Sequence, residues 1–101
     1  MGVIQTVLKE EFDRLKILQQ RYLAELDHFP KGAVSKRRRG EKFYLYLIQR
    51  QGKRVKTEYI GNWDSQKAQS VCKRIQERKE LEIKLRQVSK DLAELERALS
   101  G

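Results

Sequence analysis

The sequence predicts an α+β fold with a long amino-terminal helix, a small antiparallel sheet of two or three strands, and a long coiled-coil-like carboxy-terminal helix. Two observations support this order. Apolar residues recur every three or four positions at both ends of the chain, which is the spacing of one helical face. The middle, residues 32–61, combines aromatic and β-branched runs with glycine turns, which is typical of strands. We expect residues 1–101 to form a single domain.

The first helix is expected over residues 3–28. It must end by Phe29, because Pro30 disfavours helical geometry in the residue before it. A lean helix of about 25 residues is marginal in isolation, so its apolar stripe needs a partner. That stripe consists of Ile4, Leu8, Phe12, Leu15, Leu18, Tyr22, Leu26 and Phe29.

Residues 32–61 are expected to form a basic β-sheet module. The runs 43–50 and 53–60 are its clear strands, because they are rich in aromatic and β-branched residues. A glutamine and a glycine at 51–52 suit a two-residue hairpin loop between them. The sequence leaves open whether residues 33–38 add a third strand.

The hairpin loop sets the register of the two strands, with Arg50 opposite Lys53 and Tyr46 opposite Thr57. One face of the hairpin then consists of Tyr44, Tyr46, Ile48, Val55, Thr57 and Tyr59. The other face holds Phe43, Leu45, Leu47 and Ile60, together with Lys56 and Glu58. Both faces are apolar near the base of the hairpin. We therefore expect each face to be covered, by a flanking helix or by a second subunit.

The second helix is expected over residues 64–99, with Asp64 or Ser65 as its cap. Its first apolar stripe should cover the sheet and consists of Ala68, Val71, Cys72 and Ile75. A heptad seam follows over residues 81–99, and its members are Leu81, Leu85, Val88, Leu92, Leu95 and Leu99. The seam can pair with the first helix or with a second copy of the chain. We favour a homodimer, because this helix, about 54 Å long, exceeds the first in length.

The positive charge of the chain is concentrated in its middle. The net charge is +9, and residues 30–61 hold ten lysines and arginines against two glutamates. A local field of this sign attracts polyanions. In the predicted register Arg50 and Lys53 repel each other, and a bound polyanion relieves that repulsion. The alternative is that these cations only keep the strand edges soluble. The residues predicted to bind nucleic acid are Lys36, Arg37, Arg38, Arg39, Lys42, Arg50, Lys53, Arg54 and Lys56.

The run GAVSKRRRGEKFYLYLIQRQGKRVKTEYIG, followed by a helix, resembles the amino-terminal arm-type DNA-binding domain of phage and transposon integrases. In that family a three-stranded sheet lies in the DNA major groove and a helix packs behind it. The resemblance implies DNA contacts from Arg37, Arg39, Arg50, Lys53, Arg54 and Lys56. It does not extend to the long helix ahead of the sheet, nor to a recombinase catalytic domain.

The whole layout is also similar to a set of small bacterial and archaeal proteins of unestablished function. They share a leading helix, a Pro-Lys-Gly turn, a tyrosine-rich strand, a Gly-Lys hairpin ending in Tyr-Ile-Gly, and a charged closing helix. The matching residues here are Pro30-Lys31-Gly32, Tyr44-Leu45, Gly52-Lys53 and Tyr59-Ile60-Gly61. This similarity supports the architecture and implies no activity.

Composition argues against several classes of function. Cys72 is the only cysteine and His28 the only histidine, so we expect no internal disulfide, no metal cluster and no cofactor. No apolar run is long enough to cross a bilayer, and we expect a cytoplasmic protein without a membrane partner. No nucleophile–base pair or phosphate-cradling glycine loop is present, which argues against an enzyme and a small-molecule substrate.

We therefore predict a non-enzymatic nucleic-acid-binding protein, with duplex DNA as its target, that acts as an accessory or regulatory protein of a mobile element. Two alternatives stay open. The first is binding of RNA or a ribonucleoprotein, in which tyrosines stack on unpaired bases. The second is a coiled-coil adaptor, or an inhibitor of a nucleic-acid enzyme, whose basic residues only shape its surface.

Overall fold

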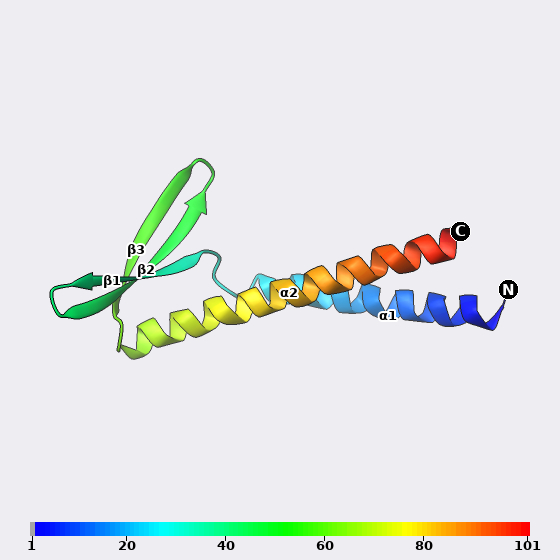
Figure 1. Ribbon diagram of the computed structural model, residues 1–101, viewed down its shortest axis with the longest axis horizontal. Helices are drawn as coiled ribbons and strands as arrows, with labels where there is room; N and C mark the ends of the chain where they lie inside the picture. Colours follow the sequence, from blue (N-terminus) through cyan, green and yellow to red (C-terminus); the bar gives the residue numbers. More distant parts are fainter. Residues whose placement is uncertain (1) are drawn as a thin grey trace. The chain divides into compact units, whose positions relative to one another are not determined.

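The computed structural model describes residues 2–101 and confirms the predicted α+β fold (Figure 1). The elements, in order, are α1 (Val3–Leu26), β1 (Ala33–Arg39), β2 (Lys42–Gln51), β3 (Arg54–Asn62) and α2 (Gln66–Ser100). The sheet therefore has three strands. The chain forms two compact units. We call them the helical unit, which comprises residues up to His28 together with Glu80–Gly101, and the sheet unit, Phe29–Lys79.

The helical unit pairs α1 with the last part of α2 in antiparallel orientation (Figure 1). Leu15 of α1 and Val88 and Leu92 of α2 are buried together. Phe12, Leu18, Tyr22 and Leu95 pack around them. At these positions the heptad seam of α2 packs against the first helix of the same chain. The first turns of α1 are more open than the apolar spacing predicts, since Ile4 is 75% exposed.

Polar contacts supplement this packing. The side chain of Gln19 donates a hydrogen bond of 3.1 Å from Nε2 to Oγ of Ser89, which ties the two helices together. On the outer surface of α1, Arg14 donates hydrogen bonds to both carboxylate oxygens of Glu11. This hydrogen bonding lowers the pKa of the Glu11 carboxyl, because it favours the ionised form.

The sheet unit contains the strands in the order β1-β2-β3, all antiparallel. The predicted register between β2 and β3 is wrong by two residues. Arg50 lies opposite Val55 and Tyr46 lies opposite Tyr59, whereas Lys53 lies in the turn. The predicted repulsion between Arg50 and Lys53 across the ladder therefore does not exist.

The turn residues explain the shift. The loop consists of Gly52 and Lys53. Gly52 has a φ of +63°, and all residues with positive φ in the described chain are glycines. A two-residue turn with positive φ at its first position is type II′, for which glycine is the usual choice. The predicted loop would have placed Gln51 at that position, where a side chain is strained.

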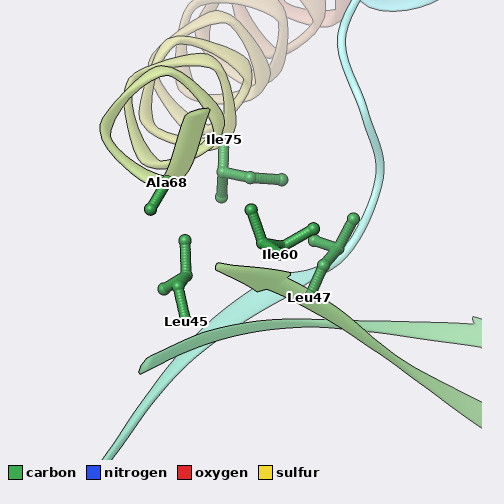
Figure 2. Close-up of a cluster of buried hydrophobic side chains, with 5 residues drawn as sticks. All are labelled: Leu45, Leu47, Ile60, Ala68 and Ile75. Atoms are coloured by element: carbon green, nitrogen blue, oxygen red, sulfur yellow. The ribbon is translucent and has the colours of Figure 1, made fainter. Parts of the chain in front are cut away.

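The core of the sheet unit lies between one face of the sheet and the first turns of α2. Figure 2 shows Leu45, Leu47 and Ile60 pointing from the strands toward Ala68 and Ile75 of α2. Leu45 and Ala68 are fully buried. The prediction that Leu45, Leu47 and Ile60 share a face is confirmed. The predicted cap at the start of α2 is also confirmed for Ser65, because its Oγ accepts a hydrogen bond of 3.1 Å from the backbone N–H of Ala68.

A register shift lies between Leu45 and Tyr46 of β2. Leu45 pairs with Gly61 and Tyr46 with Tyr59, so Ile60 is the extra residue of a β-bulge in β3. Its side chain is 9% exposed and belongs to the core. The bulge thus adds an apolar residue to the covered face of the sheet.

Candidate nucleic-acid interface

Strand alternation divides the predicted cations between the two faces of the sheet. Arg37 pairs with Tyr44, Arg39 with Lys42, and Arg50 with Val55. Side chains paired across strands lie on the same face, so Arg37, Arg39 and Arg50 lie on the side of the tyrosines. We call this side the tyrosine face, and its members are Ser35, Arg37, Arg39, Tyr44, Tyr46, Ile48, Arg50, Val55, Thr57 and Tyr59.

The tyrosine face is the side of the sheet opposite the core. Tyr59 is 55% exposed and Val55 is 59% exposed, while Tyr44 and Tyr46 are half-buried. Neither helix of the chain therefore covers the side chains of β3 on this face, and cover by a second subunit stays a prediction. An open sheet face with aromatic and cationic side chains is unusual for a surface with only a structural role.

The arginines and tyrosines of this face contact one another. The guanidinium carbon of Arg37 lies 4.7 Å from the centroid of the Tyr46 ring, and that of Arg39 lies 6.0 Å from it. Arg37 also donates a hydrogen bond of 3.3 Å from Nε to Oγ of Ser35. These contacts place both guanidinium groups beside the tyrosine rings on the exposed surface of the sheet.

The three tyrosine rings form a cluster. The ring centroids of Tyr46 and Tyr59 are 5.5 Å apart, and those of Tyr44 and Tyr59 are 6.1 Å apart. The rings are tilted by 59° and 51°, respectively. Together with Arg39 they line an open hollow of about 420 Å³, which we call the tyrosine hollow.

Four predicted cations lie on the other face, on the side of α2. Lys36 lies over two aromatic rings, with its Nζ 4.6 Å from the ring centroid of Phe43 and 4.3 Å from that of Trp63. Arg38 donates a hydrogen bond of 2.8 Å from Nε to the carbonyl oxygen of Gly40. Arg54 and Lys56 follow the same alternation, since they pair with Gln51 and Gln49.

The last two predicted cations are next to the hairpin turns. Lys53 is in the β2–β3 turn, and Lys42 is the first residue of β2. Lys42 also lines a hollow of about 440 Å³ with Phe43, Trp63 and two carboxylate residues, Glu41 and Asp64. Because Lys42 pairs with Arg39, strand alternation places it on the tyrosine side of the sheet. The structure therefore divides the nine predicted residues into four on the tyrosine side, four on the helix side and one, Lys53, in the β2–β3 turn.

The sheet unit carries all of the excess positive charge. It contains fifteen lysines and arginines against four acidic residues, a net charge of +11, whereas the rest of the chain has a net charge of −2. Five of these fifteen cations are in the first part of α2 and were not among the predicted binding residues: Lys67, Lys73, Arg74, Arg78 and Lys79.

Two of these α2 cations have a structural role. Arg78 donates a hydrogen bond of 3.0 Å from Nη1 to the carbonyl oxygen of Phe29, and Arg74 lies over the ring of Phe29 at 5.9 Å. They fasten the start of the sheet unit to α2. Sequence reasoning gave Tyr44, Tyr46 and Tyr59 a role only in the RNA alternative and did not include them among the predicted binding residues. The spacing of two residues between the first two tyrosines indicated a shared face.

The comparisons give the family of the chain. Residues 5–69 match a family described as a domain of unknown function, DUF6788. The chain belongs to this family. The DUF6788 match includes all three strands and ends in the first turn of α2. No curated protein and no solved structure matches the chain.

The side chains of the DUF6788 protein indicate which sites it can form. Among residues 2–101, no group of three or more histidine, cysteine or acidic residues is placed to hold a metal ion. In the same residues, no helix combines the length and the apolar character needed to cross a membrane. The tyrosine face, with its guanidinium groups and phenol rings, is suited to binding polyanions and planar rings by charge and stacking.

Proposed function

We propose that this DUF6788 protein is a non-enzymatic nucleic-acid-binding protein that binds duplex DNA through the tyrosine face of its sheet. One observation carries the proposal. Arg37, Arg39 and Arg50 share the face of the sheet that is not packed against α2, together with a cluster of three tyrosines. Cations beside aromatic rings on an open sheet face are typical of nucleic-acid-binding surfaces.

The dimensions of the sheet suit the major groove. Neighbouring strands are about 4.8 Å apart, so three strands span roughly 10 Å. The major groove of B-DNA is about 12 Å wide and admits a two-stranded β-ribbon, so the strands that carry Arg37, Arg39 and Arg50 can enter it. Arg50 is the natural guanine contact, because a guanidinium donates two hydrogen bonds to the O6 and N7 atoms of guanine. Arg37 and Arg39 would then contact phosphates and set the register on the duplex.

The resemblance to arm-type integrase domains supports the same geometry, since those domains also present a three-stranded sheet with a helix behind it. By this analogy we propose an accessory or regulatory role in a mobile element. We also propose a cytoplasmic location, which is consistent with a single cysteine that lacks a disulfide partner.

The test is a salt titration of DNA binding. Fluorescence anisotropy with a labelled duplex gives the dissociation constant at each salt concentration. Two phosphate contacts, from Arg37 and Arg39, predict that the logarithm of the affinity falls with the logarithm of the salt concentration with a slope of roughly −1.8. An affinity that does not change between low and moderate salt would refute the proposal.

RNA is the alternative target, and the exposed tyrosine cluster is the observation that favours it. Competition between duplex DNA and single-stranded RNA for the same labelled probe separates the two. A further alternative is a coiled-coil adaptor or an inhibitor of a nucleic-acid enzyme. This alternative predicts that replacing Arg37, Arg38 and Arg39 together by alanine leaves the adaptor or inhibitor activity intact.

A homodimer of the chain stays a prediction. The exposed aliphatic residues Val3, Ile4 and Val7 at the start of α1 are available for such a contact, with exposed fractions of 80, 75 and 56%. Light scattering over a range of protein concentrations measures the mass in solution. A mass equal to the monomer at all concentrations would exclude the dimer.

A further inference from the structure

We infer that the tyrosine hollow binds a single unstacked base of the DNA to which the protein is bound. This inference rests on the proposed function and adds a specific target, namely a duplex that contains an unpaired nucleotide. It starts from the three rings of Tyr44, Tyr46 and Tyr59, which line the hollow together with Arg39.

The rings differ in how much of their surface is available. Tyr46 is half-buried, and the guanidinium groups of Arg37 and Arg39 lie over its ring. Tyr59 is 55% exposed. Within the described residues the ring of Tyr59 contacts only the rings of the other two tyrosines, and no cation lies over it. The ring of Tyr59 therefore provides the free stacking surface.

The chemistry of the hollow selects its occupant. Phenol rings bind planar groups by stacking, and the exposed guanidinium group of Arg39 in the same wall favours an anionic or hydrogen-bond-accepting group beside them. A nucleotide combines a planar base with a phosphate and meets both requirements. The positive charge extends beyond the hollow to Arg37 and Arg50, so a polymer of nucleotides fits this face better than a free nucleotide.

The bases of a fully paired duplex cannot stack on the ring of Tyr59. These bases are stacked on one another, and only their edges are accessible in the grooves. A base that is extruded or unpaired exposes its ring, and the cost of unstacking is lowest where the base has no partner. The hollow therefore adds binding energy only when the target contains such a base.

The experiment compares three labelled probes with the full chain: a fully paired duplex, the same duplex with one extra unpaired thymidine, and the corresponding single strand. We expect the duplex with the unpaired thymidine to bind about tenfold more tightly than the paired duplex, in line with measured stacking on aromatic side chains. Tyr59→Ala should remove this preference, whereas Tyr59→Phe should retain it. Val55→Ala is the matched control, because Val55 is equally exposed on the same face of β3 but lies outside the hollow.

Each outcome has one meaning. Equal affinity for the paired duplex and the duplex with an unpaired thymidine overturns the inference and leaves the proposed function standing. Equal loss of preference in Tyr59→Ala and Val55→Ala also overturns it. Failure to bind any of the probes at low salt overturns the proposed function itself. Free thymidine monophosphate is the competitor that tests for a nucleotide site. If it competes as effectively as the duplex with an unpaired thymidine, the hollow binds nucleotides and not nucleic acid, and the inference is overturned.

Discussion

Removing charge from one face of β1 should change DNA binding much more than removing the same charge from the other face. Arg37→Gln with Arg39→Gln removes two cations from the tyrosine face, and Lys36→Gln with Arg38→Gln removes two from the helix side. The two double variants have the same net charge and alter the same strand. The lost charges lie on opposite faces of the strand.

The magnitude follows from counterion release. Each phosphate contact contributes about 0.9 to the slope of log affinity against log salt, so the tyrosine-face variant should lose about 1.8 of the slope. Between 50 and 200 mM salt, the wild-type affinity should fall about twelvefold more than that of this variant. The slope of the helix-side variant should differ from the wild-type slope by no more than about 0.9, the contribution of one phosphate contact.

The assay is fluorescence anisotropy at several salt concentrations, with thermal unfolding as a control for folding. The control is needed because Lys36 loses its contacts with Phe43 and Trp63 in the helix-side variant. An exposed cation–π contact contributes about 0.5–1 kcal/mol to stability, which leaves the variant folded. Equal flattening of the salt dependence in both variants would refute the assignment of binding to the tyrosine face, because net charge alone would then explain the affinity.

Three further predictions concern stability, each measured as the free energy of unfolding in urea. Leu45→Ala should cost about 2–5 kcal/mol because the side chain is fully buried, and a loss below about 1 kcal/mol would contradict the described core. Gly32→Ala should lower the free energy of unfolding more than Gly40→Ala. A Cβ at Gly32 would lie 2.5 Å from a backbone oxygen of β2, whereas at Gly40 nothing is within 4 Å. Both glycines have positive φ, so equal losses would show that the close approach at Gly32 is relieved. Ser65→Ala should cost about 1 kcal/mol through loss of the helix cap, and no change would mean that the backbone N–H of Ala68 finds another acceptor.

The assignment of strand residues to faces could be predicted from the sequence, but the register could not. Side chains in a strand alternate with a period of two, so a shift of two residues leaves every side chain on its predicted face. The apolar pattern around Leu45 and Tyr46 is therefore equally compatible with both registers. Only the turn distinguishes them, through the position at which Gly52 supplies its positive φ.

The sequence predicted which cations belong to the candidate site, but not how they are arranged in space. The cations of β1 were recognised as a cluster, yet their division into two faces depends on whether residues 33–39 form a strand. The sequence left that question open, because a run of four cations has no strand propensity of its own. The tyrosine hollow depends on the pairing of Tyr46 with Tyr59, which the predicted register placed two residues away.

The position of β1 at an edge of the sheet restricts how copies of the protein can associate. An edge strand has unpaired backbone groups that can pair with the edge of another molecule. In β1 four consecutive residues, 36–39, are cationic. Antiparallel pairing of two such strands would set lysines and arginines against one another across the ladder, which is unfavourable. Extension of the sheet through β1 of a second copy is thus opposed by the sequence of β1 itself.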